Sequence, residues 1–490
     1  MSLIRLQIEQ RVVLLSMESI VVSPDNSEDI TFPNNECLVV AHANGRNLLE
    51  AVQSSAEDLA AKMGKPELLM FFPSSYDPID KKSYEQACKI LKKMFPDSQM
   101  CGGLFGSTFS NEGYSMRGVT LVGLKNSDLS AEVMRIKNLR SKSKKKGKKV
   151  AKKLAKRIKP ENNAVVIFGG SGPNYPPFLL NQMNRPRKIH AFMMMNSSLF
   201  LKFPFLGKMM GNVMGRAMDR LNIGTMFNPI NKFLVELNKQ NKGIRFAGGS
   251  VIDTWNYRSA PVFINFKVSY KDSFLILLQS ETLKFGLSVG NGAVCNNKTP
   301  ESEIKFGNNM PGGFVFKIDG KWAREAMFDR IKMSSDLYYK NMGETIYVDS
   351  YHPIIVDYPE SDRDHIMMVG MNPNLKASMY TLPDSVVDDL RKGKAKAFIG
   401  YQSATSVAET ATKTLNQAKE EQGIEKIEFG LVFECINRML MLGDQFRKLV
   451  KNNKDFFGNI PFVGVTTSGE YINGTVPTNN CSVVCLVAGR

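Results

Sequence analysis

Blocks of hydrophobic and polar residues alternate regularly towards the C-terminus of the chain. An apolar run at residues 429–433 leads through a polar stretch into a segment with helical spacing that ends near Lys451. A second apolar run and a turn with glycines occupy residues 461–471, and a third run follows at 481–487. The pattern predicts a strand, a polar loop, a helix, a strand, a glycine turn and a strand.

Two weaker copies of this pattern occur earlier in the chain. The first spans residues 68–124, with an amphipathic helix at 81–95 and a glycine turn at 101–108. The second spans residues 164–278 and is interrupted by an insertion. We therefore expect a mixed α/β (α+β) fold in which repeated strand–helix–strand–strand modules form mixed sheets covered by helices.

A chain of 490 residues is longer than one core usually organises, which predicts two domains. A polar, tyrosine-containing stretch at residues 335–343 is the candidate boundary, so we expect domains at 1–342 and 343–490. Within the first domain, Gly290-Asn-Gly292 has the composition of a tight turn, and residues 283–294 are predicted to form a hairpin around it.

Composition excludes several classes of protein. The 43% apolar and 23% charged residues are typical of a globular protein, and no apolar run approaches the ~20 residues that span a bilayer. The seven cysteines are odd in number and lack a Cys-x-x-Cys pair, which indicates reduced thiols. The four histidines are isolated, so we expect no metal site and no cofactor. Together with a start that is too charged for a signal peptide, these features predict a cytoplasmic protein.

The net charge of +17 is concentrated in one tract, residues 140–159. The tract holds 12 basic residues and no acidic residue, so 17 − 12 leaves +5 for the rest of the chain. Its basic residues include Arg140, Lys144, Lys145, Lys146, Lys148, Lys149, Lys152 and Lys153. A solvated helix face is one interpretation, and contact with an anionic membrane or with nucleic-acid phosphates is the other.

A methionine-rich insertion at residues 189–235 interrupts the second copy. Eight methionines and several phenylalanines gather there, and methionine suits both irregular cores and adaptable binding surfaces. Packing as core or lid, and contact with a partner or a membrane interface, both remain open.

Residues for binding a small ligand gather in the C-terminal copy. Gly464 and Gly469 permit tight turns and close backbone approach. Arg438 follows a buried strand and could grip a carboxylate, while Glu470 could take an ammonium group. An amino acid carries both groups. The alternative is that Arg438 and Glu470 pair with each other.

Cys435 is the one credible nucleophile, but an activating base is missing from its module. Cys481 and Cys485 are expected to lie in the core, about 13 Å apart along one strand. Asp253 and Ser107 occupy comparable positions after the turns of the other copies. The candidate ligand-binding residues are Cys435, Arg438, Gly464, Thr467, Gly469, Glu470, Asp253 and Ser107.

The chain resembles the FIST (F-box and intracellular signal transduction) domain family from about residue 35 to its end. The C-terminal motifs that carry the resemblance are Phe433-x-Cys435-x-x-Arg438, Leu442-Gly443, Pro461-x-x-Gly464 and Thr467-Ser-Gly469-Glu470. The N-terminal motifs are Cys101-Gly102, Phe246-Ala-Gly248-Gly249-x-x-x-Asp253 and Ile318-Asp-Gly320. Val465-Thr-Thr-Ser468 stands where the family usually has an aromatic-rich approach, and Asn479-Asn480 where it often has His-Asn.

The resemblance implies a sensory domain that binds small molecules, with amino acids as the proposed class, and that acts on a signalling output. No kinase, cyclase or F-box pattern is visible, so we expect a stand-alone sensor with a separate signalling partner protein. We expect no catalytic residues. Two alternatives remain: a hydrolase or transferase that uses Cys435, and a scaffold docked to a membrane or nucleic acid through the basic tract.

Overall fold

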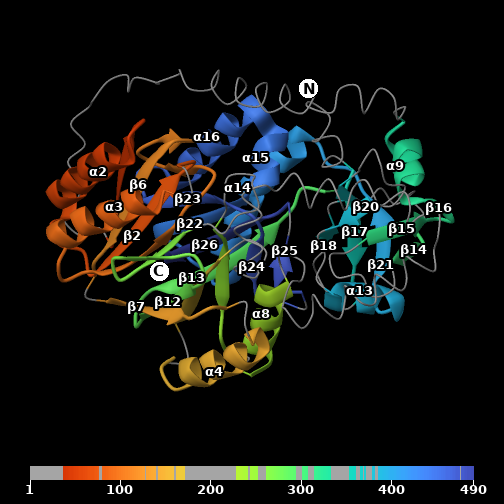
Figure 1. The fold of residues 1–490 in the computed structure, drawn as a ribbon, viewed down its shortest axis with the longest axis horizontal. Coiled ribbons are helices and arrows are strands. Elements are labelled where there is room, and N and C mark those ends of the chain that lie inside the picture. Colours follow the sequence, from red (N-terminus) through yellow and green to blue (C-terminus); the bar gives the residue numbers. More distant parts are fainter. Residues whose placement is uncertain are drawn as a thin grey trace.

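Three six-stranded sheets form the main body of the protein in a computed structural model of the whole chain (Figure 1). The structure describes residues 37–76, 80–126, 128–139, 142–158, 162–170, 228–240, 243–251, 261–293, 301–306, 314–332, 352–359, 365–367, 369–370, 378–380, 384–474, 476–479 and 481–490. The Met-rich insertion lies mostly outside these residues.

The first sheet contains the first copy of the repeat. Its strands run in the order β1 (Leu38–Asn44), β6 (Gly118–Leu124), β2 (Leu68–Ser74) and β3 (Gln99–Gly103), and the pair β2–β3 is parallel. Helices α2 (Leu48–Met63) and α3 (Lys81–Met94) pack on its outer face. Asn47 directly precedes helix α2, and its side chain caps the helix by accepting a hydrogen bond from the Leu49 N–H.

The second sheet repeats this order. Its strands are β7 (Leu129–Ile136), β12 (Ser273–Ser280), β8 (Asn163–Gly169) and β9 (Phe246–Ser250), and β8–β9 is the parallel pair. Its helices are α4 (Ser143–Ala155) and α8 (Asn228–Gln240).

The third sheet has the same order again, with strands that are distant in the sequence. They are β13 (Lys284–Gly290), β26 (Val483–Gly489), β22 (Ile427–Cys435) and β23 (Phe462–Thr467), and β22–β23 is parallel. The first strand of the hairpin predicted around Gly290-Asn-Gly292 is β13, which pairs with β26 near the C-terminus, and residues 294–300 lie outside the described part of the chain. The covering elements are α14 (Ala404–Glu421), α15 (Ile436–Leu442), a 3₁₀ turn (Gly443–Gln445) and α16 (Phe446–Phe457).

Each sheet is completed by a hairpin that belongs to another repeat. Strands β4 (Thr108–Ser110) and β5 (Tyr114–Ser115) follow β3 in sequence but extend the third sheet at β23. Strands β10 (Val262–Ile264) and β11 (Lys267–Ser269) follow β9 but extend the first sheet at β3. Strands β24 (Glu470–Ile472) and β25 (Thr478–Asn479) follow β23 but extend the second sheet at β9. The exchange is therefore cyclic, and it ties the three repeats together.

A glycine faces an aromatic residue wherever an exchanged hairpin joins its new sheet. Phe263 pairs with Gly102, Tyr471 with Gly248, and Phe109 with Gly464. A Cβ atom at Gly464 would lie 2.1 Å from the Phe109 ring, so this glycine is required by the packing of that ring. The predicted turn at Gly464 is thus a strand position.

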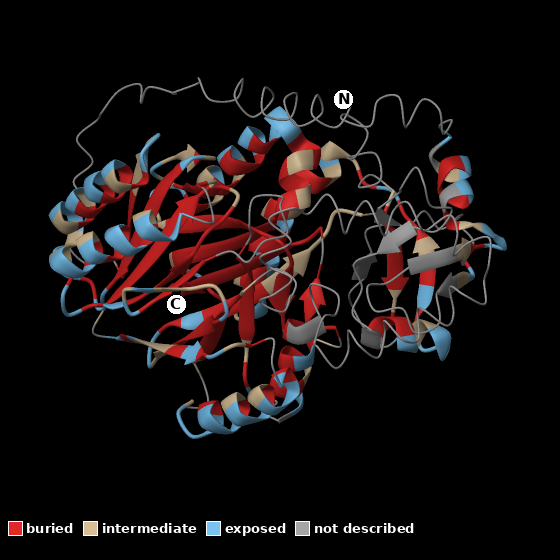
Figure 2. Cartoon of the chain, in the orientation of Figure 1, coloured by how far each residue is buried: buried red, intermediate tan, exposed pale blue. Residues whose placement is uncertain are grey.

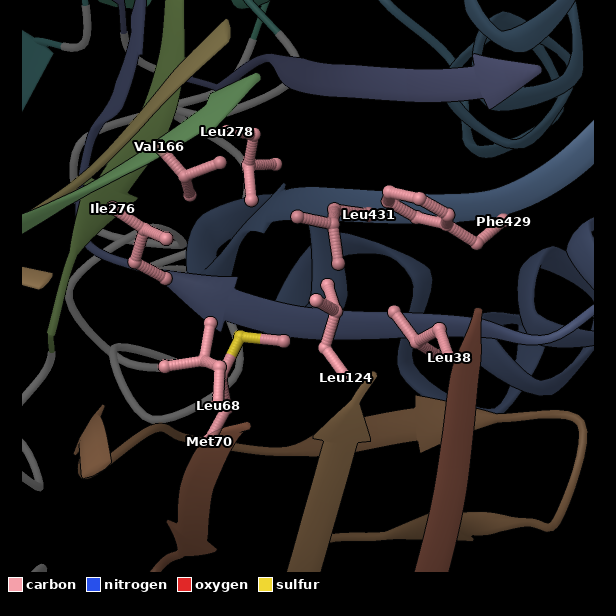
Figure 3. Close-up of a pocket in the computed structure, with 9 residues that line it drawn as sticks. All are labelled: Leu38, Leu68, Met70, Leu124, Val166, Ile276, Leu278, Phe429 and Leu431. Atoms are coloured by element: carbon pink, nitrogen blue, oxygen red, sulfur yellow. The ribbon is translucent and has the colours of Figure 1, made fainter. Parts of the chain in front are cut away.

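The inner faces of all three sheets meet in one common core. Alternate residues of the central strands, such as Phe72, Phe168 and Phe433, point into it, and the residues between them face the helices. A cavity of about 10 Å³ lies where the three repeats meet, lined by apolar side chains from each of them (Figure 3). Figure 2 shows the central strands of the three large sheets as buried, whereas exposed residues lie mainly on the outer faces of the helices, on loops and on edge strands such as β7.

Residues 301–399 form a smaller unit inserted into the third repeat, between β13 and α14 (Figure 1). One sheet contains β14 (Ile304–Phe306), β15 (Phe314–Ile318), β16 (Lys321–Trp322), β20 (Ser378–Tyr380) and β19 (Val369–Gly370). The other contains β18 (His365–Met367), β17 (Ile354–Asp357) and β21 (Lys396–Ile399), and the helices are α9 (Ala323–Ile331) and α13 (Asp384–Arg391). This unit has a separate core, to which Val476 of the third repeat also contributes. The predicted boundary at 342–343 lies outside the described residues.

Candidate functional site

A cluster of buried polar side chains lies at the carboxyl ends of β22 and β23. Its members are Glu434, Cys435, Arg438, Thr467, Glu470, Cys481 and Ser482, each at most 2% exposed. Charged residues are rarely buried without partners, so their contacts decide what the cluster can do.

Arg438 is fully buried and has internal partners. Its Nε donates to Glu434 Oε1, four residues earlier across the junction from β22 to α15. Its Nη1 and Nη2 donate to the backbone oxygens of Asn291 and Val407, each at 2.8 Å. The alternative in which Arg438 pairs with Glu470 is therefore wrong.

Glu470 is held by hydrogen-bond donors on both carboxyl oxygens. Oε1 accepts from Thr467 Oγ1 at 2.8 Å and from the Gly469 N–H at 3.2 Å, and Oε2 accepts from Ser482 Oγ at 2.8 Å. Burial, reinforced by nearby Cys435, nevertheless raises the pKa of Glu470 well above its usual value. The structure thus favours the neutral acid at this position.

Glu434 and Cys435 are neighbours in β22, so their side chains lie on opposite faces of the third sheet. The alternation follows Phe433, which points into the common core, and places Glu434 on the helix side with Arg438. Cys435 lies on the inner side, with Glu470. The structure therefore brings Arg438 and Glu470 to the same strand end, but on its two faces.

Cys435 packs against Cys481 within the cluster. Burial raises the pKa of the Cys435 thiol well above its usual value, and hydrogen bonding with Cys481 adds to this effect. A protonated, buried thiol is a poor nucleophile, which weighs against the hydrolase or transferase alternative. Cys485 lies in β26, as expected, but Cys481 precedes that strand and has a positive φ of 49°.

Two buried oxygen atoms at this strand end have no hydrogen-bond partner among the described residues. They are Glu434 Oε2 and Ser468 Oγ, and Ser468 is 8% exposed. Burial raises the pKa of Glu434, although Arg438 opposes the shift. Unsatisfied buried polar atoms are uncommon, so two of them at one strand end indicate a place where a further partner fits.

The other two repeats provide a built-in comparison. Thr108 and Val262 hold the register position of Glu470 in their own hairpins, opposite residues of β23 and β3. In each sheet, one residue of β2, β8 or β22 pairs with the glycine of the neighbouring parallel strand. Two residues further along these strands lie Pro73, Gly169 and Glu434, respectively. Only the third repeat has ionisable side chains, Glu470 and Glu434, at these two positions. The fold of the repeat therefore does not require a charge at either of them.

The remaining predicted residues are placed differently. Gly464 lies within β23 beneath Phe109, away from the strand end. The Ser107 N–H donates to Thr466 Oγ1 at 2.6 Å, which places Ser107 beside β23. Asp253 lies outside the described residues.

Sequence reasoning missed Glu434 and Ser482. Opposite charges four residues apart, as at Glu434 and Arg438, often pair on a helix, and this spacing could have suggested the ion pair, although here it spans the junction from β22 to α15. Nothing local marked Ser482, which reaches Glu470 only through the fold.

The described residues contain neither a candidate metal site nor a candidate membrane-spanning helix. There, no three side chains of His, Cys, Asp or Glu are grouped to hold a metal ion. No helix in these parts of the chain is long and apolar enough to cross a membrane.

Comparison with known protein families gives two matches. The family model of the FIST N domain matches residues 67–299, and the model of the FIST C domain matches residues 385–473. The second match covers the strand end that holds Glu434, Arg438 and Glu470. A search of curated proteins finds no match.

Proposed function

The chain belongs to the FIST family, and on this premise we propose that it is a sensory protein that binds a small ligand without transforming it chemically. FIST domains are generally sensory and signal-transduction domains. The ligand we propose is an amino acid or a similar carboxylate, bound at the carboxyl ends of β22 and β23.

The observation that carries the proposal is the buried acid Glu470, two residues after Ser468, whose buried hydroxyl has no hydrogen-bond partner among the described residues. Ligands of α/β proteins commonly bind at the carboxyl ends of parallel strands, and β22 and β23 are such a pair. An ammonium group arriving there would stabilise the ionised form of Glu470 and gain Ser468 Oγ as an acceptor.

Arg438 supplies the opposite charge on the helix side of the same strand end. Two of its donors contact the backbone oxygens of Asn291 and Val407. A carboxylate is a stronger acceptor than a neutral carbonyl oxygen, so the carboxylate of a ligand can replace such a contact. Glu434 holds the guanidinium in place during this exchange.

A thermal-shift screen tests the proposal. The wild-type protein is screened against amino acids and against the same carbon skeletons without the ammonium group. A ligand present at about 100 times its dissociation constant stabilises the folded protein by about 2.7 kcal/mol. We expect stabilisation by members of the first set and none by their ammonium-free counterparts.

Two variants locate the site. Glu470→Gln keeps the shape of the side chain but cannot become an anion, so the ligand-induced shift should be lost. Thr108→Val changes the equivalent position of the first repeat and should preserve the shift. If the ligand-induced shift in melting temperature persists in Glu470→Gln, the ligand binds elsewhere. If no compound of the screen stabilises the wild-type protein, amino acids are rejected as the ligand class.

The proposal includes a signalling partner protein in the cytoplasm. The family premise supports a partner, because a sensor requires an output. The cytoplasmic location rests on the unpaired, reduced character of the cysteines, of which the six described ones are free and buried.

A further inference from the structure

Helices α4 and α8 pack closely along one edge of the molecule (Figure 1). Gly147 makes this approach possible, since a Cβ atom there would lie 2.5 Å from the Phe233 backbone oxygen. Ala151 and Leu154 are buried in the same contact, with Leu237 of α8. The apolar side of α4 is thus packed against α8 and the second sheet.

The opposite side of α4 carries only lysines. Lys145, Lys149, Lys152 and Lys156 are exposed and follow one another at helical spacing, over about 16 Å of helix length. Figure 2 shows this outer side of α4 as exposed. Among the described residues, none of these four lysines forms a salt bridge with an acid.

The basic surface continues from α4 onto α8. Lys144 and Lys148 contact Glu236 of α8 at 3.7 and 3.8 Å, which places them between the two helices. Lys232 and Lys239 are exposed on α8, four residues before and three residues after Glu236. We call this surface the lysine platform. It comprises Lys144, Lys145, Lys148, Lys149, Lys152, Lys153, Lys156, Lys232 and Lys239.

We propose that the lysine platform docks the protein on an anionic membrane surface. Clusters of four to eight basic residues on a helix provide enough attraction to bind acidic lipid headgroups. The platform contains no arginine fork and no aromatic side chain for reading or stacking bases. Its charges also spread over two adjacent helices, whereas the ~12 Å width of a DNA major groove admits one. Because the apolar side of α4 is buried, the contact is electrostatic and shallow, without insertion.

Vesicle co-sedimentation of the full chain tests this surface. Vesicles of phosphatidylcholine alone are compared with vesicles of equal parts phosphatidylcholine and phosphatidylserine, at low and at physiological ionic strength. We expect binding to the anionic vesicles only, weakening as salt screens the charges. A Lys149→Gln/Lys152→Gln variant should bind about 30-fold more weakly, at about fivefold per lysine.

The matched control removes the same charge elsewhere. Lys413 on α14 and Lys448 on α16 are exposed and belong to the third repeat, so Lys413→Gln/Lys448→Gln should bind like wild type. Glutamine is a good helix former, and equal circular dichroism and melting temperatures confirm folding.

Three results would overturn the proposal. They are equal binding to neutral and anionic vesicles, equal loss in both double variants, and no binding of the wild-type protein. Random-sequence duplex DNA serves as a competitor. If it binds more tightly than the anionic vesicles and depends on the same two lysines, the platform is a nucleic-acid surface instead.

Discussion

Replacing Glu470 by glutamine should change how the stability of the protein depends on pH. Glu470 is completely buried, and burial raises its pKa well above the usual value. In the unfolded chain the same side chain releases its proton near pH ~4.3. Between these two pKa values the folded state holds one proton more than the unfolded state. Wild-type stability therefore falls as the pH rises through this window.

The magnitude follows from linkage. Each pH unit within the window costs the wild-type protein up to about 1.4 kcal/mol, whereas glutamine has no proton to lose. Between pH 5 and pH 7 the stability of Glu470→Gln relative to wild type should thus rise by up to about 2.7 kcal/mol. The hydroxyl group of Thr467 or Ser482 can reverse its role and accept from the amide. Each carboxyl oxygen also accepts from a backbone N–H, of Gly469 at 3.2 Å or of Ser482 at 3.4 Å, so the amide nitrogen leaves one of these N–H groups without its acceptor. That cost does not depend on pH, so it leaves the expected slope unchanged.

Melting temperatures of both proteins, measured in parallel at several pH values between 5 and 7, provide the assay. Comparing two proteins at each pH cancels the contributions of all other ionisable groups. For a chain of this size 1 kcal/mol corresponds to roughly 1–2 °C. If the difference in melting temperature between the two proteins does not vary with pH, Glu470 is not a neutral acid in the folded protein. A difference of opposite sign would show that Glu470 is ionised in the folded protein and stabilised by its donors.

Three further predictions concern single side chains. Arg438→Ala should destabilise the protein by about 3–5 kcal/mol, because Glu434 is left buried without its partner; urea denaturation measures this, and a change below 1 kcal/mol would contradict the ion pair. Gly464→Ala should cost about 1–3 kcal/mol through overlap with the Phe109 ring, and adding Phe109→Leu should restore part of it in the same assay. Cys435 should resist iodoacetamide in the native protein and react in urea, as mass spectrometry of its peptide can establish; rapid native labelling would mean that the thiol is accessible.

Local sequence patterns predicted the helices and strands of each repeat, because the hydrophobic periodicity of a helix or strand is contained in its own residues. Helix α14, for example, was expected from the spacing of Val407, Ala411 and Leu415, and those residues are buried against the third sheet. The pairing of distant strands has no such signature. Strand β13 looked like half of a hairpin, because nothing near Gly290 indicates that its partner, β26, lies close to the C-terminus.

The grouping of several candidate residues was predictable, but their contacts were not. The residue types at the end of β22 and in the turn before β24 pointed to one strand end, where the structure places Cys435, Arg438 and Glu470. The pairing could not be derived, because Arg438 has Glu434, Asn291 and Val407 as partners from three separate segments. The division of the cluster between two faces of a sheet likewise depends on the register of β22, which a one-residue shift would invert.

The cyclic exchange of hairpins has a consequence for the synthesis of this protein on the ribosome. Ser107, at the start of the β4–β5 hairpin, meets Thr466 of β23, which lies 359 residues later. At 5–20 residues per second, translation takes roughly 20–70 s to cover that distance. During this interval the first repeat has been made, but its hairpin has no sheet to join. Domains usually fold one after another as they emerge, whereas here the N-terminal repeat waits for the C-terminal one. We therefore expect chaperones that cover unpaired strand edges to bind the nascent chain until β23 is released.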